Sequence, residues 1–198
     1  MTTGIASLKK FVLHIFLWLP LCSAAWYLSA QAHTAGIGML ARFLVNQITT
    51  GIVSALERSG LDLVFVTNIR INAAPGQAAV WVPEVNPLLY TFSLALFLSL
   101  MLAERAKWWK ILVGAAVLVP FQSWGVAFDV LSQGIQLGQD FSEQAGLFGW
   151  RLIAVAVGYQ LGLLIFPTLV PVLLWASFSQ LFRESVRRAQ MQNFQRRH

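Results

Sequence analysis

The sequence predicts a mainly α-helical membrane protein that crosses the bilayer four times. Three observations support this fold class: no charged side chain occurs from Leu152 to Phe178, hydrophobic residues make up 57% of the chain, and charged residues make up only 11%. A helix of that length spans a hydrocarbon core of about 30 Å at about 1.5 Å per residue. A soluble domain has no place for a helix that is apolar on every face. We therefore treat residues 1–198 as a single membrane domain.

Four apolar segments are predicted spans, at about residues 11–30, 87–103, 111–128 and 152–178. The first has a competing interpretation as a cleaved signal peptide, because Ala30-Gln31-Ala32 has the small-x-small form of a cleavage site. Its apolar part is longer than the usual signal-peptide core of about 7–15 residues, which favours an uncleaved anchor. The second begins at Asn86-Pro87, a typical helix start with Asn as N-cap and Pro at the first helical position.

Residues 31–86 form the predicted excursion between the first two spans. From His33 to Gly60 apolar residues recur at helical spacing, which predicts an amphipathic helix that lies flat at the membrane surface or covers the mouths of the spans. Residues 61–66 and 69–71 are rich in β-formers, Pro75-Gly76 supplies a turn, and residues 79–82 form a return strand. This segment therefore predicts an extracytoplasmic β-hairpin.

The charge distribution predicts the orientation. Four spans place both termini and the turn at 104–110 on one side, where the net charge is +8, and leave a net charge of −2 on the other side. The positive-inside rule then assigns both termini to the cytoplasm. The basic tail at 183–198 indicates contact with anionic lipid rather than with nucleic acid.

The fourth span carries the candidate helix-packing residues. Gly158 and Gly162 form a small-xxx-small motif that lets a neighbouring helix approach closely, and Gln160 between them needs a hydrogen-bond partner. The alternative is that glycine is simply common in spans. Pro167 and Pro171 lie on one face and predict a bend.

The third span carries a candidate intramembrane polar site. Asp129 and Gln122 lie in or at the outer end of that span, and an acid inside a membrane is a functional candidate by default. Simple solvation at the outer interface is the alternative for Asp129. Arg151, at the start of the fourth span, is its predicted ion-pair partner.

No catalytic or metal-binding motif is evident. Cys22 and His14 share the first span, about 12 Å apart along a helix, so they do not form a nucleophile–base pair with each other. The chain has no metal-ligand spacing, phosphate loop or nucleophile elbow, so we expect no catalytic residue, metal or cofactor.

A combination of short motifs extends over nearly the whole chain: Trp18-Leu-Pro-Leu-Cys22, Glu84-Val-Asn-Pro-Leu-Leu-Tyr90, Val119-Pro-Phe-Gln-Ser-Trp-Gly125, Phe128-Asp129, Gly158-Tyr-Gln-Leu-Gly162 and Pro167-Thr-Leu-Val-Pro171. It resembles the exosortase H system-associated membrane proteins, small bacterial inner-membrane proteins encoded with an exosortase. The resemblance implies a place in envelope protein sorting and no catalytic role. Exosortases use a membrane-embedded cysteine, arginine and histidine, whereas here no arginine or histidine stands within the later spans.

The leading hypothesis is a non-catalytic accessory subunit that contacts another membrane protein, an exosortase or envelope enzyme, through its extracytoplasmic segment. The candidate partner-binding residues are Phe65, Arg70, Trp81, Glu84 and Asn86. A membrane-embedded cysteine-dependent peptidase or transferase built on Cys22 is the alternative, followed by a small transporter subunit.

Overall fold

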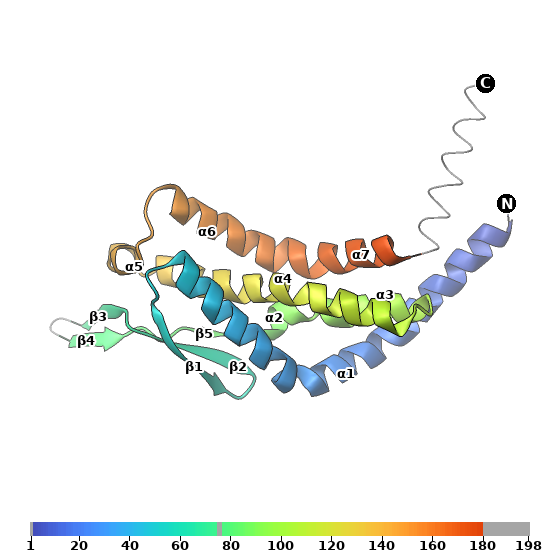
Figure 1. The fold of residues 1–198 in the computed structure, drawn as a ribbon, viewed down its shortest axis with the longest axis horizontal. Helices are drawn as coiled ribbons and strands as arrows, with labels where there is room; N and C mark the ends of the chain where they lie inside the picture. The colour runs from blue at the N-terminus through green and yellow to red at the C-terminus, as the bar shows by residue number, and fades with distance from the viewer. Residues whose placement is uncertain (1, 75–76, 180–198) are drawn as a thin grey trace, which may run out of the picture.

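The computed structural model describes residues 2–74 and 77–179. The predicted Pro75-Gly76 turn and the basic tail at 183–198 lie outside the described residues. The fold is mainly helical, with a small β layer at one end (Figure 1). The N-terminal part of α1, the turn between α3 and α4 and the end of α7 lie at the opposite end (Figure 1), which we call the termini end. The end that carries the strands is called the sheet end.

Helix α1, Thr2–Ile48, is a single helix that contains both the first predicted span and most of the predicted amphipathic helix. It bends near its middle (Figure 1). Ser29 Oγ bonds back to the Trp26 carbonyl (3.1 Å) and Thr34 Oγ1 bonds back to the Ala30 carbonyl (2.7 Å) in this region. Such bonds often bend helices, which accounts for the change of direction.

The predicted helix from His33 to Gly60 is wrong in its second half, because α1 ends at Ile48 and strand β1 covers Val53–Ser59. Gly51 has φ +81°, a left-handed conformation that interrupts the helix and suits glycine. Asn46 then holds the backbone of Val53, accepting from its N–H (2.9 Å) and donating to its carbonyl (3.0 Å). This clamp directs the chain into a strand.

The β layer consists of two small sheets. β1 pairs antiparallel with β2, Asp62–Thr67, through a tight turn at Gly60, and β2 also pairs with β5, Glu84–Val85. β3, Arg70–Ala74, and β4, Gln77–Val80, form a separate antiparallel ribbon. The predicted hairpin is therefore only loosely matched, because residues 61–66 pair chiefly with a segment that the sequence assigned to a helix.

Four spans are not confirmed. Within the described residues, three stretches are long and apolar enough to cross a membrane: Lys10–Ile48, Trp108–Ile135 and Trp150–Phe178. The second predicted span is a shorter apolar stretch, Leu88–Ala103, divided into α2, Leu88–Thr91, and α3, Ser93–Ala103. Its length of about 24 Å, at about 1.5 Å per residue, is less than a typical hydrocarbon core of about 30 Å.

The remaining helices complete the bundle. α4, Trp108–Ile135, runs from the termini end to the sheet end, and the short α5, Gln139–Ala145, follows it (Figure 1). α6, Trp150–Gln160, the π-helix η1, Leu161–Ile165, and α7, Phe166–Phe178, then return along α4. At the termini end Lys110 Nζ donates to the Phe178 carbonyl (2.9 Å), which places a cation at the C-terminus of α7.

The main core lies at the sheet end. Ile37, Ala41 and Val45 of α1 pack in one buried cluster with Phe65 of β2 and Val130 of α4. A smaller cluster of Phe97, Met101 and Leu118 joins α3 and α4 nearer the termini end. In contrast, the first half of α1 leaves large apolar side chains exposed, which is the pattern of a lipid-facing surface.

Candidate functional site

One face of α4 carries a row of polar side chains, Gln122, Asp129 and Gln133, which we call the polar face of α4. Spacings of seven and four residues bring them to the same side of the helix. This side is covered by α1 and α2 rather than by lipid. The structure thus builds a polar site inside the bundle and supplies each of its members with partners.

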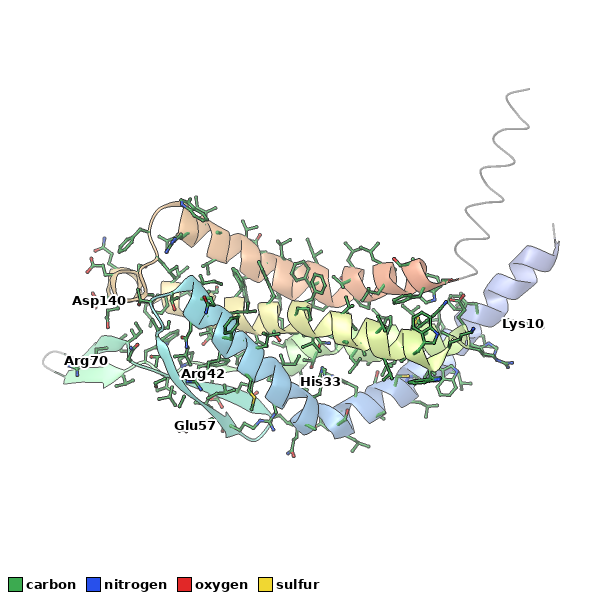
Figure 2. The ribbon with its side chains drawn as sticks, in the orientation of Figure 1. Lys10, His33, Arg42, Glu57, Arg70 and Asp140 are labelled. Atoms are coloured by element: carbon green, nitrogen blue, oxygen red, sulfur yellow. The ribbon has the colours of Figure 1, made fainter. Side chains whose placement is uncertain are left out.

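Gln122 is buried and joins three helices. Its Oε1 accepts from His33 Nε2 of α1 (2.8 Å), and its Nε2 donates to Ser93 Oγ at the start of α3 (2.9 Å). Trp26 of α1 also donates from Nε1 to Oγ1 of Thr91, the last residue of α2 (3.3 Å). His33 lies near the bend of α1 (Figure 2), so this network holds α1 at the break between α2 and α3.

Asp129 is half-buried and accepts two hydrogen bonds. Tyr90 of α2 donates its hydroxyl to Oδ2 (2.9 Å), and Gln133 donates from Nε2 to Oδ1 (3.2 Å). The same Gln133 nitrogen also donates to the carbonyl of Glu84 in β5 (3.2 Å). The carboxylate is therefore the centre of a junction between α2, α4 and the sheet.

The predicted pair between Asp129 and Arg151 is wrong. Arg151 is exposed and donates from Nη1 to the carbonyl of Gly146 (3.3 Å), just after α5. α5 and its following turn place the start of α6 there, and Tyr90 takes the position beside Asp129. Asp129 and Gln122 therefore belong to the polar face without Arg151.

The other side of α4 packs against α6 and η1. Its residues Trp124, Gly125 and Phe128 are called the packing face of α4. Trp124 stacks on Phe128 with centroids 4.4 Å apart and donates from Nε1 to the Gly158 carbonyl (3.1 Å). A Cβ added at Gly158 would lie 2.1 Å from the Phe128 ring. A Cβ added at Gly162 would lie 2.8 Å from the Cα of Gly125. The two glycines of the motif therefore lie against α4 of the same chain.

Pro167 and Pro171 are both buried in α7. Proline removes a helical N–H and its ring crowds the carbonyl four residues earlier. The π-helix η1 ends at Ile165, two residues before Pro167, and widens the backbone there, with Ile165 at φ −96°. Gln160, at the end of α6, is exposed on the outside of the bundle.

The β layer is fastened to the helices at the sheet end. Gln144 of α5 donates from Nε2 to the Arg70 carbonyl (2.9 Å) and accepts from the Arg70 N–H (3.0 Å). Thr50, just after α1, donates to the Gln144 carbonyl (2.9 Å), and Trp81 packs edge-on against Phe141 of α5 (5.0 Å). β3 thus occupies a defined position relative to α5.

The predicted partner-binding residues divide into two groups. Phe65 is 0% exposed and Trp81 is 8% exposed, so both belong to the core and their assignment to a partner surface is wrong. They face inward because the sheet packs on α1, α4 and α5. Arg70, Glu84 and Asn86 are exposed, and Asn86 accepts from the Leu88 N–H (3.0 Å) as a cap of α2.

The cysteine and histidines do not form a nucleophile–base pair within the described residues. Cys22 is buried in α1, His14 bonds to the Lys10 carbonyl of its own helix (2.6 Å), and His33 bonds to Gln122. Within residues 2–74 and 77–179, no group of three or more His, Cys, Asp or Glu side chains is arranged to hold a metal ion. The chemistry of this site is hydrogen bonding between helices.

Comparison with known protein families identifies a family whose model matches most of the chain. The model for the exosortase H-associated membrane proteins covers residues 5–182. The chain belongs to this family. Its description names a membrane protein associated with exosortase H, and the resemblance seen in the sequence motifs is confirmed. No curated protein and no solved structure matches the chain.

The sequence did not predict several partners within this exosortase H-associated membrane protein: His33, Tyr90, Gln133 and Gln144. The spacing of Gln122, Asp129 and Gln133 on one helical face was the available signal for the polar face. Apart from the bond between Asp129 and Gln133, their partners come from segments 29 to 89 residues away in sequence, so no local pattern marks them.

Proposed function

We propose that the chain is a non-catalytic accessory subunit of an exosortase H system, acting through its sheet end. The observation that supports this best is the attachment of the β layer to the membrane helices by Gln133 and Gln144. An accessory protein that positions a partner needs a contact surface at a fixed height above the membrane. These bonds hold the β layer at a fixed position relative to α4 and α5.

The proposed topology has four crossings, with Leu88–Ala103 as a short second crossing and both termini in the cytoplasm of a bacterium. Figure 1 supports it, because α1 and α4 run between the termini end and the sheet end, α3 runs to the termini end, and α6 to α7 return there. The basic residues Lys10, Arg105, Lys107 and Lys110 lie at the termini end, as the positive-inside rule requires for a cytoplasmic side. The sheet end is then extracytoplasmic.

The proposed contact surface is the outer part of the β layer. β1 is an edge strand, since it pairs with β2 and with no second strand among the described residues. Its residues 57–59 are exposed, and so are Arg70, Val80 and Val82 of the ribbon region. An exposed strand edge accepts an extended peptide by strand addition, with main-chain hydrogen bonds supplying affinity. A partner's extended segment fits this surface.

The test is co-purification of exosortase H with the tagged protein from its native membrane in mild detergent. In the variant, residues 72–78 are replaced by Asn-Gly, which joins Ile71 to Ala79 by a two-residue turn of the kind favoured in hairpins. This change shortens the ribbon and leaves the Arg70–Gln144 bonds and the core intact. We expect the exosortase to be recovered with the wild type and reduced at least tenfold with the variant.

Two controls make the result specific. Gln47→Ala changes an exposed side chain near the end of α1 and should leave co-purification unchanged. Thermal unfolding in detergent should show that the shortened variant remains folded. Equal recovery of exosortase with the wild type and the folded variant would refute the role of the ribbon, and its absence from the wild-type preparation would refute the accessory role.

A further inference from the structure

The outer face of α6, η1 and α7 is an uncovered surface that runs the length of the bundle. These elements form one long edge of the molecule, on the other side of α4 from the sheet (Figure 1). Their large exposed side chains are apolar: Ile153, Val157, Leu164, Ile165, Leu169, Val172 and Leu173. Lipid would cover such a surface without cost.

Gln160 is the exception on this face. Its side chain is exposed, and no described residue forms a hydrogen bond with its amide. In contrast, the exposed polar side chains of α7 bond to carbonyls one turn earlier in the chain: Thr168 donates to the Leu164 carbonyl (3.0 Å) and Ser177 donates to the Leu173 carbonyl (2.8 Å). A hydroxyl can use its one donor on a carbonyl of its own helix. A glutamine amide has two N–H donors and a carbonyl acceptor, and such local bonds do not satisfy all of them.

The depth of Gln160 makes this amide expensive to leave against lipid. It lies ten residues after Trp150, the first residue of α6, which corresponds to about 15 Å along the helix. It also lies level with the apolar part of α4, because Gly158 contacts Phe128 and Gly162 contacts Gly125 on either side of it. In hydrocarbon an unsatisfied polar group costs several kcal/mol relative to a paired one.

We propose that a second copy of this chain covers the face, with the two Gln160 side chains hydrogen-bonded to each other across a two-fold axis along the membrane normal. Such an axis brings equivalent residues to the same depth. A carboxamide is self-complementary, since the oxygen of one side chain accepts from the nitrogen of the other. A second copy therefore supplies the matching group at the required height.

The residues around Gln160 suit close approach of two helices. Residues three, four and seven positions before Gln160, and four positions after it, share its side of the helix. They are Val157, Ala156, Ile153 and Leu164. Ala156 is small enough for the two backbones to come near each other at this position. The inference is independent of the proposed association with exosortase, since it depends only on this face.

The experiment is disulfide cross-linking in the native membrane. Gln160→Cys is made in a Cys22→Ala background, which removes the single native cysteine. The membranes are treated with copper phenanthroline as oxidant, so that two thiols lose their hydrogens and form one S–S bond. We expect a product with twice the mass of the chain. Leu17→Cys in the same background is the matched control, because Leu17 is 64% exposed on α1, away from this face, and should give no such product.

Two further variants test the hydrogen bond itself. Gln160→Leu should leave the thermal unfolding of the dilute monomer in detergent unchanged, because Gln160 has no partner among the described residues of its own chain. It should weaken dimerisation in lipid nanodiscs or micelles by about 3- to 20-fold, the effect of one interhelical hydrogen bond, and Gln160→Asn should restore part of the loss. A cross-link to a protein of another mass, the absence of any cross-link at 160, or equal dimerisation of Gln160→Leu would each overturn the proposal.

Discussion

The two faces of α4 hold their neighbours by different means. The polar face, Gln122, Asp129 and Gln133, binds α1, α2 and the sheet through side-chain hydrogen bonds. The packing face, Trp124, Gly125 and Phe128, binds α6 and η1 through close contact between small residues and rings. Hydrogen bonds specify which side chains meet, whereas close packing specifies how far apart two backbones lie. α4 therefore fixes both the register and the spacing of the bundle.

The largest expected effect is on the packing face. Gly162→Ala adds a Cβ that would lie 2.8 Å from the Gly125 Cα, and a backbone atom cannot move aside as a flexible side chain can. We expect a loss of about 1–3 kcal/mol in the free energy of unfolding, typical of overpacking, measured by thermal or denaturant unfolding in detergent.

Gly36→Ala is the matched control for that substitution. Gly36 is helical in α1, and a Cβ added there meets nothing within 4 Å. The change should therefore raise stability slightly, by up to about 1 kcal/mol, through the better helix propensity of alanine. If both substitutions have the same effect, close approach at Gly162 is not what holds α6 to α4.

On the polar face, Gln122→Leu should destabilise by about 1–2 kcal/mol, because it leaves the His33 Nε2 donor without its acceptor and removes the donor to Ser93 Oγ. The double variant with His33→Leu should lose less than the sum of the single changes, since His33 and Gln122 form one bond. Additive losses in this double-mutant cycle would contradict the coupling. Gln47→Leu, at an exposed position of α1, should change stability by less than about 0.5 kcal/mol.

A smaller effect is expected for Tyr90→Phe, about 1 kcal/mol. The substitution keeps the ring over Gly125 and removes the hydroxyl that donates to Asp129. Tyr27→Phe is its control, because Tyr27 is 54% exposed on α1 and should tolerate the change. Equal stability of the Tyr90 and Tyr27 variants would show that Asp129 does not depend on α2 for its position.

The smallest effect should come from Trp124→Phe, about 0.5 kcal/mol, the average for a hydrogen bond between membrane helices. It removes the donor to the Gly158 carbonyl and preserves a ring to stack on Phe128. Trp150→Phe, at a position 73% exposed, serves as the reference in the same unfolding assay. A loss larger than that of Gly162→Ala would reverse our assignment of this face to packing.

The sequence predicted what depends on long uniform patterns. The apolar runs at 11–30, 111–128 and 152–178 all lie in stretches able to span a membrane, since hydropathy over some 20 residues decides this. The short motifs also indicated the family that the comparison confirmed.

The failures have a common physical cause, which is contact between distant segments. Residues 53–59 had an acceptable helical pattern, and they became β1 because Asn46 clamps Val53 and β2 lies alongside. The sequence assigned Phe65 and Trp81 to a partner-binding surface, but α1 and α5 cover them. The break at Phe92 and the junction at Asp129 likewise depend on neighbours in space.

The bond between Arg70 and Gln144 joins residues 74 positions apart, which has a consequence for biogenesis. During synthesis the strands of residues 53–85 emerge first and are able to pair among themselves at once. The helices that bury their inner side, α4 and α5, emerge only later. Until then Phe65 and Trp81 lack that cover, in a segment that on our topology has already crossed the membrane. The nascent chain therefore passes through a stage with an uncovered apolar sheet, the stage at which aggregation or assistance by a chaperone is expected.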